Sequence, residues 1–318
     1  MPEEEKPIQK EDLEDPDEDP GRIKENDLKE GLLYTAEDGS QKILRRRRPL
    51  LEVKNMSMQF GQNQVLRNIN LQIRRGETVA VIGESGCGKT VLLKTIIGLL
   101  WPTSGKIYFD GKNLAKLSSR QLTDVRTRYG FVFQQAALFD SMSIGENISF
   151  PIRQNKKKVG RKEMNERVEF LLHEVGLNPD VVNRMPAELS GGMRKRVGFA
   201  RALVMDPELM LYDEPTTGLD PIMSDVINEL IIQARDKHRV TGIIVTHDMK
   251  SAMKVADRIV MLYPTSRLNE GEPQILFDGK PEEMETCKDL RVSQFINGEA
   301  GERLMEMARA KKTADKEE

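Results

Sequence analysis

The sequence predicts an α/β fold, and three observations carry that prediction. Apolar runs typical of buried strands alternate with amphipathic helical patterns between residues 209 and 263, as expected for a sheet covered by helices. The glycine-rich stretch GESGCGKT, at 83–90, lies between a buried strand pattern and a helical pattern. Two alternating stretches, within 50–60 and 68–73, favour an additional antiparallel β piece.

The other elements follow from hydrophobic periodicity. Residues 136–205 are mostly helical in pattern and interrupt the strand–helix alternation, which predicts a helical subdomain. The helix that begins at Lys89 is expected to stop before Pro102. In chain order we expect strands at 77–83, 129–135, 209–215, 242–248 and 258–263, a hairpin at 105–114, and helices at 89–100, 160–180, 190–205, 221–237 and up to Val255.

Composition restricts the class of protein. The 318 residues allow one large domain or two small ones. Mean hydropathy is −0.52, and the sequence has no run of eighteen apolar residues, so we expect no membrane span in this chain. The net charge of −2 argues against general nucleic-acid binding. Cys87 and Cys287 are far apart in sequence, which fits a reducing cytoplasm better than a disulfide framework.

The two ends differ in composition from the rest of the chain. Residues 1–30 carry 13 acidic and 5 basic side chains, and we therefore expect a disordered acidic extension over 1–48 with no secretory signal. Its basic run, 45–48, is either a solvated charge cluster or a contact for anionic lipid headgroups. Residues 291–318 are charged and helix-prone, which predicts a helical C-terminal extension.

The stretch GESGCGKT matches the phosphate-binding pattern G-x-x-x-x-G-K-[ST]. Its glycines allow backbone N–H groups to surround phosphate oxygens at a helix N-terminus. Lys89 should reach the β- and γ-phosphates, and the Thr90 hydroxyl should bind Mg²⁺. Cys87 is either a small tolerated residue or a redox-sensitive thiol. The expected phosphate-binding residues are Gly83, Glu84, Ser85, Gly86, Cys87, Gly88, Lys89 and Thr90.

A second acidic element is LMLYDEP, at 209–215. Its apolar residues predict a strand that carries Asp213 and Glu214 to its carboxyl end, where open α/β sheets bind ligands. Asp213 suits a contact to Mg²⁺, and Glu214 suits polarisation of an attacking water. Together with the phosphate loop, these acids predict phosphoryl-transfer chemistry.

At this point the sequence resembles the ATP-binding-cassette ATPases over about residues 50–290. Six elements occur in that family's order: GESGCGKT as Walker A, FVFQQ as the Q-loop, LSGGM as the signature, LMLYDE as Walker B, TGLD as the D-loop and VTHD as the switch histidine. The resemblance implies a P-loop NTPase with a RecA-like core, an antiparallel β subdomain and a helical subdomain. It also implies ATP hydrolysis with ATP and Mg²⁺ as cofactors.

The resemblance assigns further site residues. Phe60 takes the position of an aromatic ring that stacks on adenine. Gln134 would contact Mg²⁺ and water, and His247 would contact the γ-phosphate. Asp220 would complete the site from the D-loop. The assigned catalytic residues are Glu214, His247, Gln134 and Lys89, and the assigned metal ligands are Thr90, Gln134 and Asp213.

The signature LSGGM, at 189–193, also carries information of its own. Ser190 is a good N-cap, and Gly191 and Gly192 leave helix N–H groups uncovered, so this helix start should attract an anion. In the family that anion is the γ-phosphate of ATP bound to the other protomer, which implies a two-fold homodimer. The following basic residues, 194–196, are interpreted as a solvated face or an interface.

Finer features resemble the ATPase subunit of Mce-associated, Mla-type lipid transporters: Met193 in the signature, the stretch QQAALFDSMSIGENISFPIR, and the long C-terminal tail. This implies a separate membrane permease, an Mce-type lipid-binding protein, phospholipid as cargo, and peripheral attachment at the cytoplasmic face of the inner membrane. The insertion at 264–274 departs from the pattern; it either reaches a partner or is a tolerated surface loop. The alternatives are an ATPase for small-solute import and a soluble cassette factor acting on ribosomes or DNA.

Overall fold

A computed structural model describes residues 32–35, 41–44, 49–155 and 159–299. The chain divides into two units, 1–48 and 49–318. In the first unit, β1 (Leu32–Thr35) and β2 (Gln41–Leu44) pair as an antiparallel hairpin. The expectation of disorder over 1–48 is therefore wrong for these two strands. Both are richer in apolar and β-branched residues than the acidic stretch before them, and such residues favour strands. The rest of that extension lies outside the described residues.

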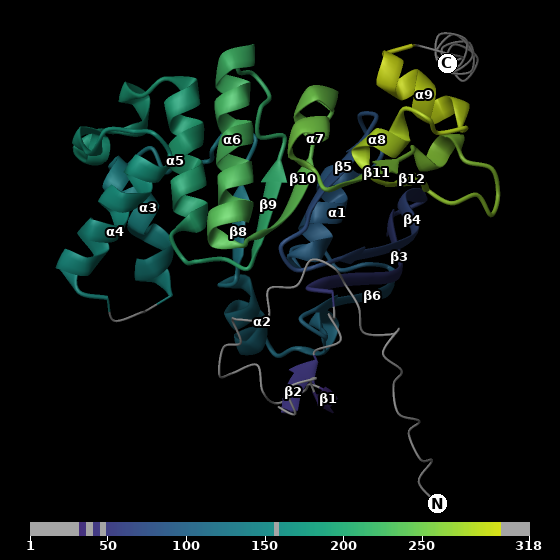
Figure 1. Cartoon of the computed structure of the whole chain (residues 1–318), viewed down its shortest axis with the longest axis horizontal. Helices are drawn as coiled ribbons and strands as arrows, with labels where there is room; N and C mark the ends of the chain where they lie inside the picture. The colour runs from purple at the N-terminus through teal and green to yellow at the C-terminus, as the bar shows by residue number, and fades with distance from the viewer. Residues whose placement is uncertain (1–31, 36–40, 45–48, 156–158, 300–318) are drawn as a thin grey trace, which may run out of the picture. The chain divides into compact units, whose positions relative to one another are not determined.

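The second unit is built on a six-stranded sheet in the order β12-β11-β5-β10-β9-β8 (Figure 1). Pairing is parallel from β8 through to β11, and β12 adds an antiparallel edge. The predicted α/β fold with a mainly parallel sheet is confirmed. The strands are β5 (Thr78–Gly83), β8 (Tyr129–Val132), β9 (Leu209–Asp213), β10 (Thr241–Val245), β11 (Arg258–Leu262) and β12 (Ile275–Gly279).

Successive side chains of these buried strands point to opposite faces of the sheet. On one face Val79 and Leu211 pack with α1 (Lys89–Ile96) and with the antiparallel sheet. On the other face Tyr212 and Ile244 pack with α5 (Gly191–Leu203) and α6 (Pro221–His238), whereas Ile82 and Met261 pack with residues of α7 (Met249–Val255), α8 (Pro281–Met284) and α9 (Leu290–Asn297). Both faces are thus covered, which explains why the strands are apolar throughout.

The antiparallel sheet has the strand order β4-β3-β6-β7. The alternating burial along β3 confirms the half-buried strand that its sequence predicts. The hairpin expected at 105–114 is formed by β6 and β7. The bounds are β3 (Leu51–Phe60), β4 (Asn63–Ile73), β6 (Ser104–Phe109) and β7 (Lys112–Asn113), followed by a 3-10 turn η3 (Leu114–Lys116) and by α2 (Ser119–Arg126).

The helical region between β8 and β9 comprises α3, α4 and α5, drawn in teal in Figure 1. Val168, Leu171 and Leu172 of α4 are buried, as the predicted apolar face requires. They join a core cluster with α5, and that cluster continues into α6. The bounds are α3 (Ile144–Gln154), α4 (Arg161–Glu174), η4 (Pro179–Asn183) and η5 (Pro186–Glu188).

The helix expected at 89–100 is shorter than predicted. It ends at Ile96, because Gly98 adopts a left-handed conformation with φ of 68°. The Leu99 N–H then donates to the Lys94 carbonyl at 2.9 Å, which closes the last turn. Pro102 therefore follows the helix end rather than causing it. Among the described residues no helix is long and apolar enough to cross a membrane.

Candidate nucleotide site

The loop 83–90 connects the end of β5 to the start of α1, next to β11. Gly83 and Gly88 both have positive φ, 145° and 100°. A Cβ atom at Gly83 would lie 2.2 Å from the Leu262 carbonyl oxygen, and one at Gly88 would lie 2.7 Å from the Leu66 side chain. Only glycine fits both positions. The backbone therefore turns tightly at the mouth of the sheet, as the phosphate-binding pattern predicts.

Lys89, the first residue of α1, is buried within this loop. Its Nζ donates to the carbonyl oxygens of Gly83, at 2.8 Å, and Glu84, at 3.0 Å. The ammonium group is thus held across the loop by neutral carbonyl groups and has no carboxylate partner among these contacts. A phosphate would offer it a stronger, charge-assisted hydrogen bond.

Cys87 is 1% exposed, inside the same loop. Burial raises the pKa of its thiol, although the positive charge of Lys89 opposes that effect. A raised pKa lowers the thiolate fraction, and the thiolate is the reactive form. These properties support the reading of Cys87 as a small tolerated residue over that of a redox-sensitive thiol.

Walker-type acids follow β9, the neighbour of β10 in the sheet. Asp213 Oδ1 accepts a hydrogen bond from Thr90 Oγ1 at 3.3 Å, so the fold brings these two predicted metal ligands together. Burial raises the pKa of Asp213; the Thr90 hydrogen bond opposes this shift, and the nearby Glu214 charge adds to it. A partly buried carboxylate with a raised pKa is a group that a cation would stabilise.

The donor chemistry at this point fits Mg²⁺. A hydroxyl and a carboxylate are hard oxygen donors, and Mg²⁺ is usually bound by one or two protein groups together with substrate phosphates. Among the described residues no group of three or more His, Cys, Asp or Glu side chains could hold a metal ion without such help. Thr90 and Asp213 therefore suit a metal that arrives with a nucleotide.

Glu214 and His247 come from the ends of adjacent strands. The Glu214 N–H donates to the Val245 carbonyl of β10 at 2.9 Å, and Glu214 has a φ of 50°. Its Oε2 lies 2.8 Å from His247 Nδ1 and accepts from Thr217 Oγ1 at 3.1 Å. This side chain is oriented by two partners, as a group that must position a water would be.

Phe60 and Gln134 are both on the surface. Phe60, at the end of β3, is 48% exposed. Gln134 follows β8 and is exposed. The fold leaves both side chains accessible, and no hydrogen bond or ion pair among the described residues links either of them to the loop 83–90.

The signature begins α5, as predicted. Ser190 is the N-cap, and its Oγ accepts from the Met193 N–H at 3.3 Å. Ser190 and Gly191 are exposed. Asp220 caps α6 by accepting from the N–H groups of Ile222 and Met223, and a Cβ at Gly192 would meet the Met223 side chain at 3.0 Å. The signature therefore lies beside the start of α6, with Ser190 and Gly191 exposed while Leu189 and Met193 pack against the core.

With this geometry in hand, comparison with known proteins gives the family. The family model described as ABC transporter matches residues 66–217. The intermembrane phospholipid transport system ATP-binding protein MlaF of Haemophilus influenzae is 39% identical over 251 residues, which are 79% of this chain and 91% of that protein. The chain belongs to the ABC transporter family. It is the ATP-binding subunit, an ATPase coupled to transport.

Two further relatives extend the comparison. The probable ribonucleotide transport ATP-binding protein mkl of Mycobacterium leprae is 39% identical over 248 residues, covering 78% of this chain and 69% of that one. Among solved structures, the dimeric ATP-binding cassette MJ0796 bound to ADP and Pi is similar with a TM-score of 0.64 at 32% identity, covering 73% of this chain and 98% of that one. This similarity confirms the cassette-type fold.

Residues 194–196 were expected to form a solvated face or an interface, and the solvated alternative is wrong for Lys195, which is 8% exposed in this ABC transporter cassette. Its Nζ donates to the carbonyls of Pro215, at 2.8 Å, and Thr217, at 2.5 Å. Arg194 and Arg196 also donate to backbone carbonyls of their own chain. Lys195 therefore joins the signature helix to the loop that follows Glu214. A run of basic residues does not reveal this burial, because the helical period alone does not show which basic side chain points inward.

Sequence reasoning also missed Arg201, which is 9% exposed on α5. Its guanidinium donates to the carbonyls of Ala136 and Ala137, both at 2.7 Å. Both alanines have positive φ, 61° and 48°, which is costly for a residue with a Cβ. Arg201 thus holds a strained backbone that begins two residues after Gln134. An arginine among small apolar residues of a helix, as in FARAL, was the available signal.

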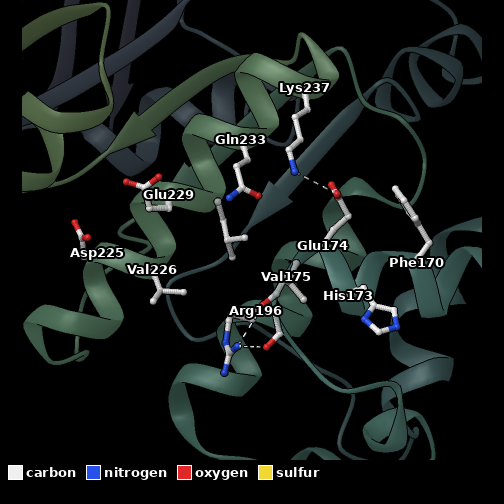
Figure 2. A pocket seen from close by; sticks show the side chains of 12 residues that line it. Phe170, His173, Glu174, Val175, Arg196, Asp225, Val226, Glu229, Gln233 and Lys237 are labelled. Carbon is white, nitrogen blue, oxygen red and sulfur yellow. Dashed lines mark hydrogen bonds and ion pairs between the residues drawn. The ribbon is translucent and has the colours of Figure 1, made fainter.

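The cassette also has a pocket of about 510 Å³ that is separate from the nucleotide residues (Figure 2). It lies between the end of α4, the first turns of α5, and α6. Lys237 and Glu174 approach each other at 3.6 Å across it. The twelve described residues that line it do not include any predicted site residue.

Proposed function

We propose that this ATPase drives the movement of phospholipid through a separate membrane permease. The observation that carries the ATPase site is the grouping of Lys89, Thr90 and Asp213 at the same sheet edge as the Glu214–His247 pair. Phosphoryl transfer needs positioned phosphates, neutralised charge and an oriented water, and these residues provide groups for each.

The proposed roles follow from these contacts. Lys89 exchanges the Gly83 and Glu84 carbonyls for β- and γ-phosphate oxygens. Thr90 and Asp213 would hold Mg²⁺, which would supply charge neutralisation for the phosphates. Gln134 is assigned as a further ligand by the family resemblance alone. Glu214 accepts the proton of the attacking water. His247 fixes the Glu214 carboxylate through Nδ1 and keeps Nε2 available for the γ-phosphate.

A second copy of the chain completes each site in this proposal. Ser190, Gly191 and Gly192 present helix N–H groups at the surface, and Asp220 lies beside them. A helix start of this kind binds an anion. In the homodimer it would bind the γ-phosphate held by the partner, while Phe60 stacks on the adenine. The dimeric form of the similar cassette MJ0796 supports this arrangement.

We further propose that the ABC domain spans 50–290, with a helical subdomain at about 136–205 that receives the permease and a C-terminal extension at 291–318. The subunit would be peripheral, at the cytoplasmic face of the inner membrane. An Mce-type lipid-binding protein would act in the same complex. This part rests on the similarity to the phospholipid transport subunit MlaF.

The second candidate cargo is a small polar solute. It is favoured by the relative mkl, whose name assigns it to ribonucleotide transport at the same 39% identity. The two candidates predict different stimulation of the ATPase. The permease complex, purified with this chain and reconstituted, should hydrolyse ATP several-fold faster with phospholipid in the bilayer or nanodisc than in detergent alone. Stimulation by soluble ribonucleotide instead would favour the second candidate.

A further inference from the structure

The insertion at 264–274 contacts the phosphate loop. It joins β11 to β12 and contains a short 3-10 turn, η6 (Thr265–Arg267). Arg267 Nη1 donates to Glu84 Oε1 at 2.7 Å. Glu84 is the residue whose carbonyl oxygen accepts from Lys89 Nζ. A side chain of the insertion is therefore paired with a carboxylate of the loop that carries the phosphate-binding lysine.

The same segment is anchored by a buried amide. Gln274 is 1% exposed, and its Nε2 donates to the carbonyls of Cys87, at 3.0 Å, and Val65, at 3.1 Å. Its Oε1 accepts from the Arg67 N–H at 2.8 Å. Both the nitrogen and the oxygen of the Gln274 amide are thus hydrogen-bonded, which fixes the segment against both the phosphate loop and β4.

Aromatic and ionic contacts set the position of Arg267 itself. Its guanidinium lies 4.9 Å from the centre of the Tyr263 ring, and the Arg291 guanidinium of α9 lies 5.1 Å from the same ring. Arg291 in turn pairs with Glu272, at 2.6 Å, and with Asp289. The loop-facing arginine is therefore held by a network that includes the first turn of α9. A tolerated surface loop does not need these contacts.

The charges of Arg267 and Glu84 bear on how the loop 83–90 would bind phosphates. The triphosphate of ATP is strongly anionic, and an uncompensated carboxylate in the loop that binds it would repel it. The guanidinium of Arg267 compensates the Glu84 charge within a partly buried pair whose side chains are 21% and 17% exposed. Such a pair is screened less than a surface pair.

We infer that the insertion 264–274 is a positioning element of the phosphate loop, in which Arg267 neutralises Glu84 and Gln274 anchors the segment. This inference rests on the proposed ATP site at 83–90. It assigns Arg267 a part in the affinity for nucleotide phosphates, outside the set of residues that touch the nucleotide.

The test measures the Kd of the full chain for a non-hydrolysable ATP analogue with Mg²⁺. Arg267→Ala should weaken binding about fivefold, because it leaves a carboxylate charge beside the phosphates. The double variant Arg267→Ala/Glu84→Gln should bind the analogue more tightly than Arg267→Ala does, because the carboxylate charge is removed, and Arg267→Lys should keep most of the affinity. Raising the salt concentration should reduce the difference in Kd between Arg267→Ala and the unaltered chain.

Arg258→Ala is the matched control. Arg258 lies at the opposite end of β11, pairs with Glu77 at 2.7 Å, and has the same 21% side-chain exposure as Arg267. Arg258→Ala should lower the melting temperature about as much as Arg267→Ala does, without a change in the Kd for the analogue. Equal Kd values for Arg267→Ala and Arg258→Ala, or a double variant as weak as the single one, would overturn the inference. Failure of the unaltered chain to bind the analogue would overturn the proposed ATP site as well.

Discussion

Glu214 has both a strained backbone conformation and a side chain held by hydrogen-bonding partners. Its backbone is in the left-handed region, a conformation that costs free energy for any residue with a Cβ. Its carboxylate is held between His247 and Thr217. A strained backbone with an oriented side chain at the end of a buried strand is typical of a catalytic position, which supports the proposed role of Glu214 in activating water.

Glu214→Gln should therefore lower the ATP hydrolysis rate by at least about 100-fold, because the amide cannot accept the proton of the attacking water. ATP binding should remain, so the variant should accumulate as an ATP-bound dimer. Phosphate release and light scattering measure the two effects. Glu174→Gln is the matched control, since Glu174 pairs with His238 at 2.9 Å, away from the site. Full turnover by Glu214→Gln would contradict the proposed role.

The raised pKa of Asp213 gives a second prediction at this scale. Because its pKa is higher in the folded chain than the ordinary value of 3.8, the folded state binds this proton more tightly than the unfolded state. The stability that this difference contributes is present below pH 3.8 and is lost as the pH rises through the folded pKa. At neutral pH the charged Asp213 therefore lowers stability.

Asp213→Asn should accordingly raise the melting temperature of the nucleotide-free chain by about 2 °C at pH 7. This increase in melting temperature should become smaller towards pH 4, because Asp213 in the original chain is increasingly protonated there. Hydrolysis should fall strongly in the same variant. Differential scanning calorimetry across pH measures the first effect. A gain that stays constant from pH 4 to pH 7 would contradict the role of the Asp213 charge.

At the scale of elements, α5 does more than begin with the signature. Its Lys195 reaches the loop after Glu214, and its Arg201 reaches the backbone after Gln134. One helix thus connects three motifs that are far apart in sequence. Burial lowers the pKa of the Arg201 guanidinium. Burying this cation costs free energy of folding, and its hydrogen bonds to the Ala136 and Ala137 carbonyls offset part of that cost.

Arg201→Lys should therefore lower the free energy of unfolding by about 1–3 kcal/mol, because one ammonium cannot replace the fork that spans both carbonyls. Urea unfolding measures this effect. ATPase activity in the permease complex should also fall, since the segment after Gln134 would lose its fixed conformation. Arg194→Lys is the control, because Arg194 donates to one nearby carbonyl, that of Leu189, among the described residues. Equal losses in the two variants would contradict a special role for Arg201.

At the scale of the whole molecule, the exposed signature is the surface that the proposed dimer would use. Gly191 is exposed, and a Cβ there would meet only an Arg194 side-chain nitrogen, at 4.0 Å. An acidic side chain at this position can be accommodated in the monomer and would even suit a helix N-terminus. In the proposed dimer, however, it would face the γ-phosphate of the partner.

Gly191→Asp should thus keep the melting temperature within about 2 °C of the original while abolishing ATP-induced dimerisation in the Glu214→Gln background. Analytical ultracentrifugation with and without ATP measures the association. Dimerisation of the double variant at the original ATP concentration would contradict the proposed use of the signature. A collapse in melting temperature would show instead that Gly191 is needed for folding.

The sequence by itself determined the α/β class, the two sheets, the helical region and the order of the motifs. These features depend on local periodicity and on short-range backbone requirements, which each stretch carries in its own residues. It also placed Ser190 as an N-cap and Gly83 in a tight turn. It was wrong where the pattern was uninformative: it extended α1 past Gly98, and it extended disorder over the strands β1 and β2.

Only the tertiary structure decided which side chains meet. Glu214 and His247 are 33 positions apart, and Arg267 and Glu84 are 183 apart. Their pairing follows from the order of strands in the sheet and the course of its connections, which local sequence does not specify. For the same reason, the sequence did not predict that the side chains of Lys195 and Arg201 point inward. A helical pattern gives spacing around an axis, whereas burial is set by the elements that pack against it.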